Sequence, residues 1–311
     1  MPDLHPRRLR SSGALVRNAI ALAREDPRAF AMALDRRWYH RRYGHLGDEF
    51  VDADWDTLVI MDAARPDILR DLDPFDAPIE DRYSPGSYSK QFMERQFNGR
   101  QLHDTVYVTA NPHVHDVEDG VFHAIENLLE THWDEDLETV PPEAVTSAGL
   151  AAFETYPDKR LVVHFMQPHF PFIGPVGRTV PAGIGTRIDD RESPHPWQAQ
   201  SEGRGVGRER LRRAYRENHR VVLPNVRALV ERLPGRTVVT ADHANLIGER
   251  GFPVPIRLYG HPVDFPHPDL LRVPWVRFDG EPRAVTAEAP VERASIETDV
   301  VRDRLESLGY A

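Results

Sequence analysis

The chain has 311 residues, of which 40% are hydrophobic and 28% charged, with a net charge of −10 and no cysteine. This apolar content is enough to bury a core, which excludes a wholly disordered chain. The absence of cysteine excludes disulfides, thiolate metal sites and a cysteine nucleophile. No run of about 18 apolar residues is present, so we expect no membrane span, and the acidic balance argues against nucleic acid as a partner.

The basic residues are almost all arginine. Lys90 and Lys159 are the only lysines, so 37 of the 39 basic residues are Arg. Few lysines together with many aspartates suggest a salt-adapted host, because high salt screens the self-repulsion of an acidic surface. The first residues, MPDLHPRRLRSSG, are not followed by the apolar stretch of a secretory signal. We therefore expect the protein in the cytoplasm.

Residues 1–48 differ from the rest and are predicted to be a basic N-terminal extension. Residues 1–45 hold ten arginines against four acidic residues. Apolar residues at roughly helical spacing predict a helical arm, divided in two by Pro27. Two interpretations remain open. The arm packs on its own acidic domain, which we favour, or it is an amphipathic segment that contacts an anionic membrane surface, which would place the protein at the inner face of the membrane.

From residue 49 to 311, short β-branched apolar runs alternate with helical stretches. Five runs are predicted to be buried strands: 56–62, 105–111, 160–166, 236–242 and 273–279. Helices are expected near 88–97, 117–131, 143–156, 208–232 and 291–308. The alternation predicts one α/β domain with a mostly parallel central sheet and helices on both faces. Residues 174–207, rich in Gly, Pro, Arg and Ser, predict a long irregular loop, which in a compact domain is often functional.

Polar residues follow three of the predicted strands. Asp62 ends the first strand, Asp242 and His243 follow a later one, and the strand at 160–166 runs into Gln-Pro-His169. In open parallel sheets, ligands gather at the carboxyl ends of the strands. Two carboxylates and an imidazole are suitable ligands for a divalent metal ion. One aspartate after a strand is often only a helix N-cap, but three polar strand ends in one chain favour a site.

Six segments, taken in order, give the chain a resemblance to a known family. They are DTLVIMDAARPD (56–67), GSYSKQFMERQF (86–97), VHFMQPHFPF (163–172), AYRENHRVVLPNV (214–226), VVTADHANLIGERG (238–251) and YGHP…LRVPWV (259–276). Together they resemble the sulfatase-like branch of the alkaline phosphatase superfamily, which includes sulfatases and phosphoglycerol transferases. The resemblance implies an alkaline-phosphatase-like α/β fold and a metal-dependent hydrolase or transferase of phosphate or sulfate esters. It also implies that Asp62, Asp242 and His243 ligate the metal.

The resemblance further implies a Ser or Thr nucleophile at the start of a helix after Asp62, which would be the remaining metal ligand. The stretch GSYSKQF offers Ser89, which aligns best, and Ser87, with Ser84 more remote. A helix N-terminus favours an attacking alkoxide and a developing negative charge. Metal coordination would also lower the pKa of the hydroxyl. The alternative is that these serines are cap or turn residues.

One departure from the family bears on the reaction. Formylglycine sulfatases need a Cys- or Ser-x-Pro-x-Arg motif, and the chain has neither. We therefore predict a phosphoester hydrolase or transferase that acts on a phosphodiester or phosphoglycerol-type ester. A sulfatase without formylglycine and a non-catalytic binding relative remain the alternatives. The partner would be an anionic ester, and the family also allows a glycan- or lipid-linked one.

The third strand end resembles the one-metal pattern of the family, because Gln167 stands where two-metal members have a carboxylate. One divalent ion is implied, and Mn²⁺, Zn²⁺ and Mg²⁺ all suit the ligands. His169 would then face the anionic group of the substrate, as a hydrogen-bond donor or as the acid for the leaving group. His164, His261 and Arg65 are further candidates for substrate binding, with structural roles in a strand, a loop and a helix surface as alternatives. Other histidines lack supporting context and are expected at the surface or in loops: His103, His113, His115, His195, His219 and His267.

Overall fold

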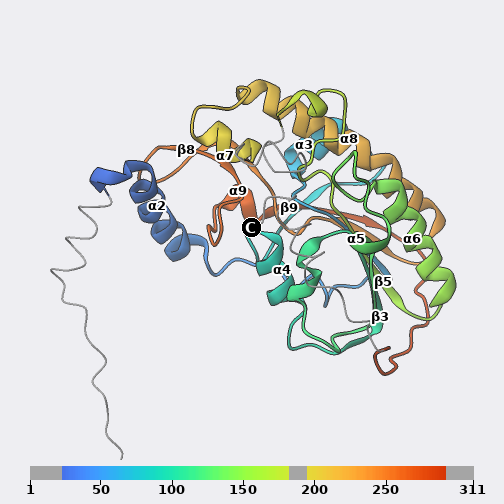
Figure 1. Ribbon diagram of the computed structural model, residues 1–311. Coiled ribbons are helices and arrows are strands. Elements are labelled where there is room, and N and C mark those ends of the chain that lie inside the picture. Colours follow the sequence, from blue (N-terminus) through green and yellow to red (C-terminus); the bar gives the residue numbers. More distant parts are fainter. Residues whose placement is uncertain (1–22, 182–194, 292–311) are drawn as a thin grey trace, which may run out of the picture.

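The computed structural model describes residues 23–181 and 195–291. A seven-stranded sheet forms the centre of the molecule, in the order β2-β9-β6-β1-β5-β3-β4 (Figure 1). Its strands are β1 (Thr57–Met61), β2 (Glu80–Tyr83), β3 (Leu102–Thr109), β4 (Phe122–Asn127), β5 (Arg160–Phe165), β6 (Thr237–Thr240) and β9 (Arg272–Phe278). A separate two-stranded antiparallel sheet consists of β7 (Leu246–Arg250) and β8 (Arg257–Gly260).

The large sheet is mostly parallel, as predicted. β1 runs parallel to β5 on one side and to β6 on the other, and β3 runs parallel to both β5 and β4. Within this sheet, β9 and β2 are antiparallel to their neighbours. All five residues of β1 are buried, because a central parallel strand is covered on both faces. The carboxyl ends of β1, β3, β5 and β6 therefore meet at one edge of the sheet.

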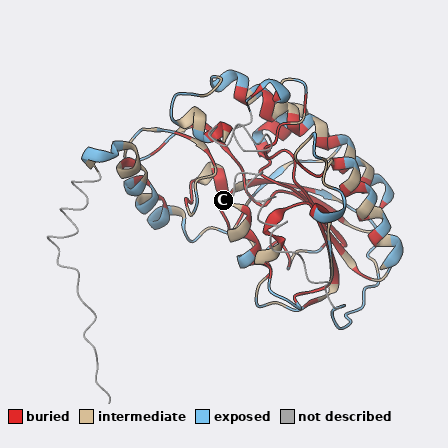
Figure 2. Ribbon diagram, in the orientation of Figure 1, coloured by how far each residue is buried: buried red, intermediate tan, exposed pale blue. Residues whose placement is uncertain are grey.

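Helices cover both faces of this sheet. The described residues form the helices α2 (Pro27–Tyr43), α3 (Pro66–Leu72), α4 (Ser89–Gln96), α5 (Leu128–Thr131), α6 (Pro142–Thr155), α7 (Pro196–Ser201), α8 (Arg208–Arg232) and α9 (Pro268–Leu271), with 3₁₀ turns η1 (Pro112–Asp116) and η2 (Gly177–Thr179). Of these, α2 and α7 lie against the smaller sheet of β7 and β8. Tyr107 pairs with Val162, so the two share a face, and the Tyr107 ring lies 5.5 Å from that of Phe97 at the end of α4. Val163 points to the other face, where a Cβ on Gly149 of α6 would lie 3.3 Å from it. Figure 2 shows the strands between these layers as mainly buried.

The five predicted strands are all present, but one predicted helix is wrong. The segment 117–131 was expected to be helical. Instead, residues 122–127 form β4, which pairs with β3 at the edge of the sheet, and only Leu128–Thr131 are helical. Pairing with a neighbour distant in sequence overrides a weak local helix preference. The helix predicted at 291–308 lies outside the described residues apart from its first position.

The predicted loop at 174–207 is partly structured. The 3₁₀ turn η2 and the helix α7 lie within it, while residues 182–194 are not among those described. Helix α7 begins at Pro196, whose fixed φ and missing N–H suit the first helical position.

The described part of the N-terminal extension is helical, with a break where Pro27 predicts one. Residues 23–25 are helical, Asp26 is not, and α2 starts at Pro27 with the Asp26 side chain accepting from the N–H of Ala29 at 2.8 Å. Tyr39 of α2 packs in an apolar cluster with residues of β7, β8 and α9. Arg36, Arg37, Arg41 and Arg42 stay exposed, so packing occupies only one side of the helix. Within the described ranges, no helix has the length and hydrophobicity to cross a membrane.

Candidate active site

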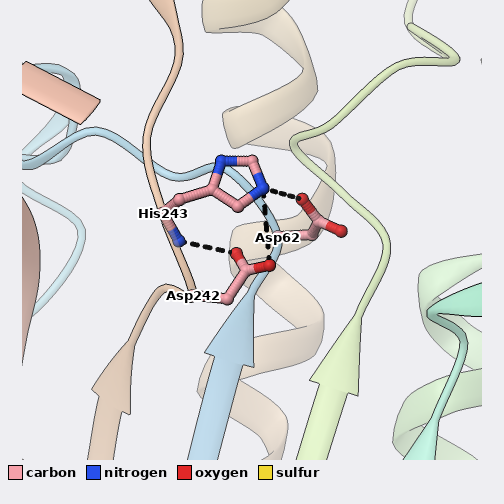
Figure 3. A group of neighbouring side chains, drawn as sticks. All are labelled: Asp62, Asp242 and His243. Atoms are coloured by element: carbon pink, nitrogen blue, oxygen red, sulfur yellow. Dashed lines mark hydrogen bonds and ion pairs between the residues drawn. The ribbon is translucent and has the colours of Figure 1, made fainter. Parts of the chain in front are cut away.

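Two adjacent parallel strands bring Asp62, Asp242 and His243 together. Asp62 directly follows β1, and Asp242 and His243 follow β6 after one intervening residue, Ala241 (Figure 3). The Nε2 atom of His243 lies 3.5 Å from Oδ1 of Asp62 and 3.5 Å from Oδ2 of Asp242. All three side chains are fully buried. The convergence expected from the strand ends is therefore what the fold produces.

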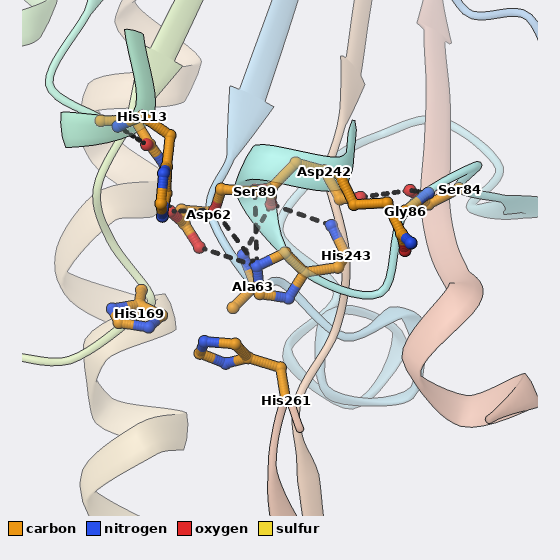
Figure 4. A network of polar contacts seen from close by, with 12 residues as sticks. Asp62, Ala63, Ser84, Gly86, Ser89, His113, His169, Asp242, His243 and His261 are labelled. Carbon is orange, nitrogen blue, oxygen red and sulfur yellow. Dashed lines mark hydrogen bonds and ion pairs between the residues drawn. The ribbon is translucent and has the colours of Figure 1, made fainter. Parts of the chain in front are cut away.

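Ser89 completes this group, from the first turn of α4 (Figure 4). Its Oγ lies 3.3 Å from Oδ2 of Asp62 and 3.3 Å from Nε2 of His243. Ser87 is used elsewhere, since its Oγ accepts from the N–H of Phe265 at 3.1 Å. Ser84 donates to the backbone carbonyl of Asp242. Of the three serines that the sequence offered, Ser89 is the one in contact with both an aspartate and the histidine.

The chemistry of this group fits a divalent cation. Oδ1 of Asp62 and Oδ2 of Asp242 are buried and accept no hydrogen bond within the described structure, a costly state for a carboxylate unless a cation neutralises it. The Nδ1–H of His243 donates to the carbonyl of Ala244 at 3.0 Å, which leaves Nε2 with its lone pair toward the carboxylates. One potential ligand atom from each of the three side chains lies within 4.8 Å of the others.

The two aspartates respond differently to burial. Burial and the nearby Asp242 carboxylate raise the pKa of Asp62 well above its usual range. Burial also acts to raise the pKa of Asp242, but His243, His164 and backbone donation by Ala63 outweigh it and lower that pKa. Ala63 has a φ of 61°, which is unusual for a residue with a Cβ, and its N–H donates to Asp242 at 3.0 Å. The strained backbone at Ala63 thus helps to keep Asp242 ionised.

Asn111 belongs to this group and was missed by the sequence reasoning. It is the second residue after β3, is fully buried, and donates from Nδ2 to Oδ2 of Asp62 at 2.6 Å. The sequence does contain a signal for Asn111, because this residue ends the apolar run 105–111 in the same way that Asp62 ends the run 56–62. An amide that follows a strand is not by itself a typical metal ligand, so the sequence pattern does not single it out.

His169 and His261 lie beside the group, as the sequence suggested (Figure 4). The ring of His261 lies 4.6 Å from that of His243 and 5.0 Å from that of His169. Each donates its Nδ1–H to a carbonyl oxygen: His261 to the Asn245 side chain at 2.7 Å and His169 to Phe170 at 2.5 Å. Burial, with the neighbouring histidines, lowers the pKa of His169 to about 3 and that of His261 well below its usual range. Both rings are therefore neutral near pH 7, each with its Nδ1–H bonded to a carbonyl oxygen, and contact of His169 with a substrate stays a prediction.

His164 and Arg65 lie in different surroundings from those that substrate binding would need. His164 is fully buried within β5, where Nδ1 lies 2.9 Å from the Tyr107 hydroxyl and Nε2 lies 3.9 Å from Oδ2 of Asp242. Burial lowers its pKa to about 4. The Arg65 guanidinium bonds Asp67, Glu249 and the carbonyl of Asn245. These contacts favour a structural role for both residues, and His164 lies next to the Asp242 carboxylate.

Three of the remaining histidines are buried. The expectation of a surface or loop position is wrong for His219, which lies within α8, whereas His267 lies in the loop directly before α9. His113, His219 and His267 are 7%, 0% and 5% exposed, respectively. His113 pairs through Nδ1 with Asp116 at 2.7 Å, and His219 accepts from the N–H of Arg65 at 3.3 Å. Each has a polar partner that makes burial tolerable, which local sequence does not reveal.

Comparison with known proteins supports the fold. No protein-family model matches the chain, and no curated protein matches it by sequence. Among solved structures, it is similar to the integral membrane lipooligosaccharide phosphoethanolamine transferase A (EptA) from Neisseria meningitidis, with 10% identity and a TM-score of 0.50 over 86% of this chain and 59% of that one. The chain thus spans less than two thirds of the length of EptA.

Two further structures match less closely. They are a putative sulfatase from Bacteroides thetaiotaomicron, with 12% identity and a TM-score of 0.45 over 82% of this chain and 70% of that one, and a protein in the alkaline phosphatase superfamily from Vibrio parahaemolyticus, with 12% identity and a TM-score of 0.40 over 78% and 63%. The chain therefore shares the α/β fold of EptA over the matched region.

Proposed function

We propose that the protein is a metal-dependent phosphoester hydrolase or transferase with Ser89 as its nucleophile. The observation that carries the proposal is the position of the Ser89 hydroxyl, 3.3 Å from both Asp62 Oδ2 and His243 Nε2. It stands beside two buried carboxylate oxygens that accept no hydrogen bond in the described structure. A hydroxyl, two carboxylates and an imidazole in one buried group form the donor set of a divalent-cation site.

Asp62, Asp242, His243 and Ser89 would hold the cation. When bound, the cation stabilises negative charge on phosphoryl oxygens and lowers the pKa of a coordinated hydroxyl. The protein contributes the fixed geometry: Asn111 holds Asp62, and the backbone of Ala63 holds Asp242. Residues that orient ligands in this way commonly change metal affinity or activity by about 10–100-fold when removed.

The reaction at Ser89 is a displacement at phosphorus. A bond forms between Ser89 Oγ and phosphorus, the ester P–O bond breaks, and the serine proton leaves overall with the departing alcohol. Water or a second alcohol then takes the phosphoryl group from Ser89, which regains its proton. Ser89 opens α4, and the exposed backbone N–H groups of a helix N-terminus favour negative charge on an attacking oxygen and on the phosphoryl group.

Phosphate esters are favoured over sulfate esters for two reasons. The chain lacks the sequence motif from which formylglycine is made. EptA, whose fold it shares, is a phosphoethanolamine transferase by name. A transferase and a hydrolase would differ only in whether an alcohol or water reaches the phosphorylated serine.

The test begins with metal analysis of the purified full-length chain. Mn²⁺, Zn²⁺ and Mg²⁺ are then supplied in turn to protein stripped with EDTA. We expect about one divalent ion per chain, and hydrolysis of bis(4-nitrophenyl) phosphate that is lost on stripping and regained on addition. Rapid quenching followed by mass spectrometry is expected to find phosphorylated Ser89.

The alternatives give different results in the same assays. Faster turnover of 4-nitrophenyl sulfate than of 4-nitrophenyl phosphate and bis(4-nitrophenyl) phosphate would overturn the proposal in favour of a sulfatase. A metal-loaded chain with no turnover of any of the three esters would favour a binding protein. Hydrolysis that survives both EDTA and the change Ser89→Ala would remove the site from the reaction altogether.

A further inference from the structure

The outward side of α2 is basic and carries no exposed carboxylate. Four arginines, all exposed, lie in the second half of the helix: Arg36, Arg37, Arg41 and Arg42. Asp35 is the only acidic residue between Pro27 and Tyr43, and it is fully buried. Figure 2 shows the side of α2 that faces away from the domain as mainly exposed.

These four arginines do not hold α2 on its own domain. Within the described residues, no carboxylate lies at ion-pair distance from any of them. Elsewhere in the chain, Arg70, Arg100 and Arg216 each pair with at least one carboxylate. Four unpaired cations on one helix of a protein with a net charge of −10 indicate an anionic partner from outside the described chain.

Arg28, near the start of the same helix, has different surroundings. Its Nη2 donates to the carbonyl of Arg257 at 2.9 Å. It also lines a cavity of about 500 Å³ together with Trp197 and His261. The arginines of α2 thus divide into one that bonds the domain and four that form no ion pair with it.

Apolar side chains lie among these charges. Phe30, Leu34 and Trp38 are four residues apart and so form a row along the helix. Leu34 is 38% exposed, and the other two are partly exposed. Arg37 and Arg41 follow Leu34 and Trp38 by three positions and therefore flank the row. A basic helix with such a row has the pattern of an interfacial helix.

The loop between β7 and β8 extends this row. Phe252 is 52% exposed, and its ring lies 4.6 Å from that of Trp38. The loop is fixed to α2, because Oδ1 of the buried Asp35 accepts from the N–H of Val254 at 2.8 Å. Only five large apolar side chains are exposed in the described part of the chain, and Leu34 and Phe252 are two of them. Apolar side chains grouped in this way indicate an interaction surface.

The combination of cations and apolar side chains indicates the kind of partner. Nucleic acid would neutralise the arginines but leave Leu34 and Phe252 in water. A bilayer accommodates both kinds of side chain. Its anionic headgroups attract arginine, while aromatic and aliphatic side chains insert at the boundary between headgroups and acyl chains.

We propose that α2 and the loop 251–256 dock the protein on an anionic membrane. The docking face consists of an apolar part that inserts among the lipids and a basic part that contacts their headgroups: Leu34, Trp38 and Phe252, with Arg37, Arg41 and Arg42. The inference goes beyond the proposed reaction and does not rest on it, so either can fail without the other.

Sedimentation with vesicles tests the docking face in the full-length protein. Vesicles of phosphatidylcholine alone are compared with vesicles in which one quarter of the lipid is phosphatidylserine or phosphatidylglycerol. We expect similar binding to both anionic mixtures, none to phosphatidylcholine, and weaker binding as salt is raised, because salt screens the charges. Binding to only one of the two anionic lipids would overturn the proposal, since it would indicate recognition of one headgroup.

Two double variants test the basic part. Each arginine near an anionic surface is expected to strengthen binding about fivefold, so Arg37→Gln with Arg41→Gln should weaken it about 25-fold. Arg220→Gln with Arg232→Gln removes the same charge from exposed positions of α8 and should change binding much less. Equal losses in both double variants would overturn the docking face, because only the net charge would then matter.

A second pair of variants tests the apolar part. Phe252→Ser should weaken binding about tenfold, the scale of burying part of an aromatic ring. Val285→Ser changes an exposed valine outside the docking face and should leave binding unchanged. Thermal melting shows whether each variant folds, and Leu34→Gln repeats the test on α2. Binding at the wild-type level in both Phe252→Ser and Leu34→Gln would overturn the insertion.

Tryptophan fluorescence locates the contact directly. Bromine atoms on the acyl chains quench a tryptophan that inserts among them. We expect such vesicles to quench the wild type and to quench Trp38→Phe much less, although four of the five tryptophans remain. Quenching that is absent from the wild type, or unchanged in Trp38→Phe, would overturn the proposal.

Two other partners are tested with the same variants. Binding to a DNA duplex in preference to anionic vesicles would assign the docking face to nucleic acid and overturn the membrane as partner. A dimer in solution that dissociates on changing Arg37 and Arg41 to Gln would assign the face to a second copy of the chain, with the same consequence.

Discussion

Strand β1 has a buried aspartate at each end, and the two have opposite surroundings. Asp56 precedes the strand and is 2% exposed; its Oδ2 accepts from the backbone N–H of Arg236 at 2.7 Å, and its Oδ1 accepts from that of Arg283 at 3.2 Å. Asp62 follows the strand, fully buried, with Oδ1 accepting no hydrogen bond and a second carboxylate nearby. In the sequence the two cannot be told apart, since each is an aspartate directly next to the apolar run TLVIM.

The difference teaches how to separate a structural carboxylate from a functional one. Asp56 ties β1 to the segments around Arg236 and Arg283, and every hydrogen bond it accepts is made inside the protein. Asp62 is held by Asn111 and Ser89 on one oxygen, and its other oxygen accepts no hydrogen bond from the described residues and lies 3.5 Å from Nε2 of His243. A buried carboxylate oxygen without a hydrogen-bond donor is what we expect of a ligand-binding residue rather than of a structural one.

The largest effect is expected from Asp62→Asn. The metal content should fall to background and turnover by at least about 10³-fold, as when one member of a catalytic unit is removed. The melting temperature of the metal-free protein should not fall, because the change relieves repulsion from Asp242. Metal analysis, kinetics and calorimetry measure the three. Asp56→Asn is the matched control and should keep both metal and turnover; normal metal content in Asp62→Asn would remove it from the ligand set.

The next largest effect is expected from Ser89→Ala. Turnover should fall by about 10³-fold or more, while Asp62, Asp242 and His243 still retain metal. Ser87→Ala removes the hydroxyl two residues earlier, which serves Phe265, and should cost only about 1 kcal/mol of stability. Metal analysis together with kcat distinguishes these outcomes. If Ser87→Ala abolishes turnover and Ser89→Ala does not, the nucleophile has been assigned to the wrong serine.

A smaller effect is expected from Asn111→Ala. Asn111 does not belong to the proposed ligand set but holds one of its members, so metal affinity should weaken by about 10–100-fold. Excess metal should restore most of the turnover, which it cannot do for Asp62→Asn. Titration of stripped protein with Zn²⁺ or Mn²⁺ gives the affinity. Loss of turnover that no metal concentration rescues would instead place Asn111 in direct contact with the substrate.

The smallest effect on turnover is expected from Asp56→Ala. The change leaves the backbone N–H groups of Arg236 and Arg283 without their acceptor, which should cost about 2–4 kcal/mol of the free energy of unfolding. Denaturant unfolding measures this loss, and the metal-loaded enzyme should keep its kcat at temperatures where it remains folded. A fall in kcat without a fall in stability would mean that Asp56 acts in the reaction, which contradicts the contrast drawn between Asp56 and Asp62.

Much of the fold and part of the site were predictable from the sequence. Apolar runs such as TLVIM and LVV are long enough to be buried strands in almost any arrangement, and alternation with helices makes them parallel. The carboxyl ends of parallel strands must then share an edge of the sheet. The sequence alone therefore predicts that four residues lie near one another: Asp62, Asp242, His243 and His169. Ser89 needed the resemblance to a known family as well, because a serine after a glycine-rich turn has many other uses.

Other features depended on contacts between segments distant in sequence. The helix expected at 117–131 became the edge strand β4 because β3 offers it a hydrogen-bonding partner. Helix α2 buries Tyr39 against the domain while four arginines stay exposed, so contact with an anionic membrane stays a prediction.

Local sequence determined five of the strands and the polar residues that end them, because burial and strand termination there follow from the side chains themselves. Only the tertiary structure decided that Asp56 is satisfied while Asp62 is not, and that Trp197 and Arg28 share a cavity with His261. The physical reason is that the satisfaction of a buried polar atom depends on partners from distant parts of the chain, whose positions no local pattern specifies.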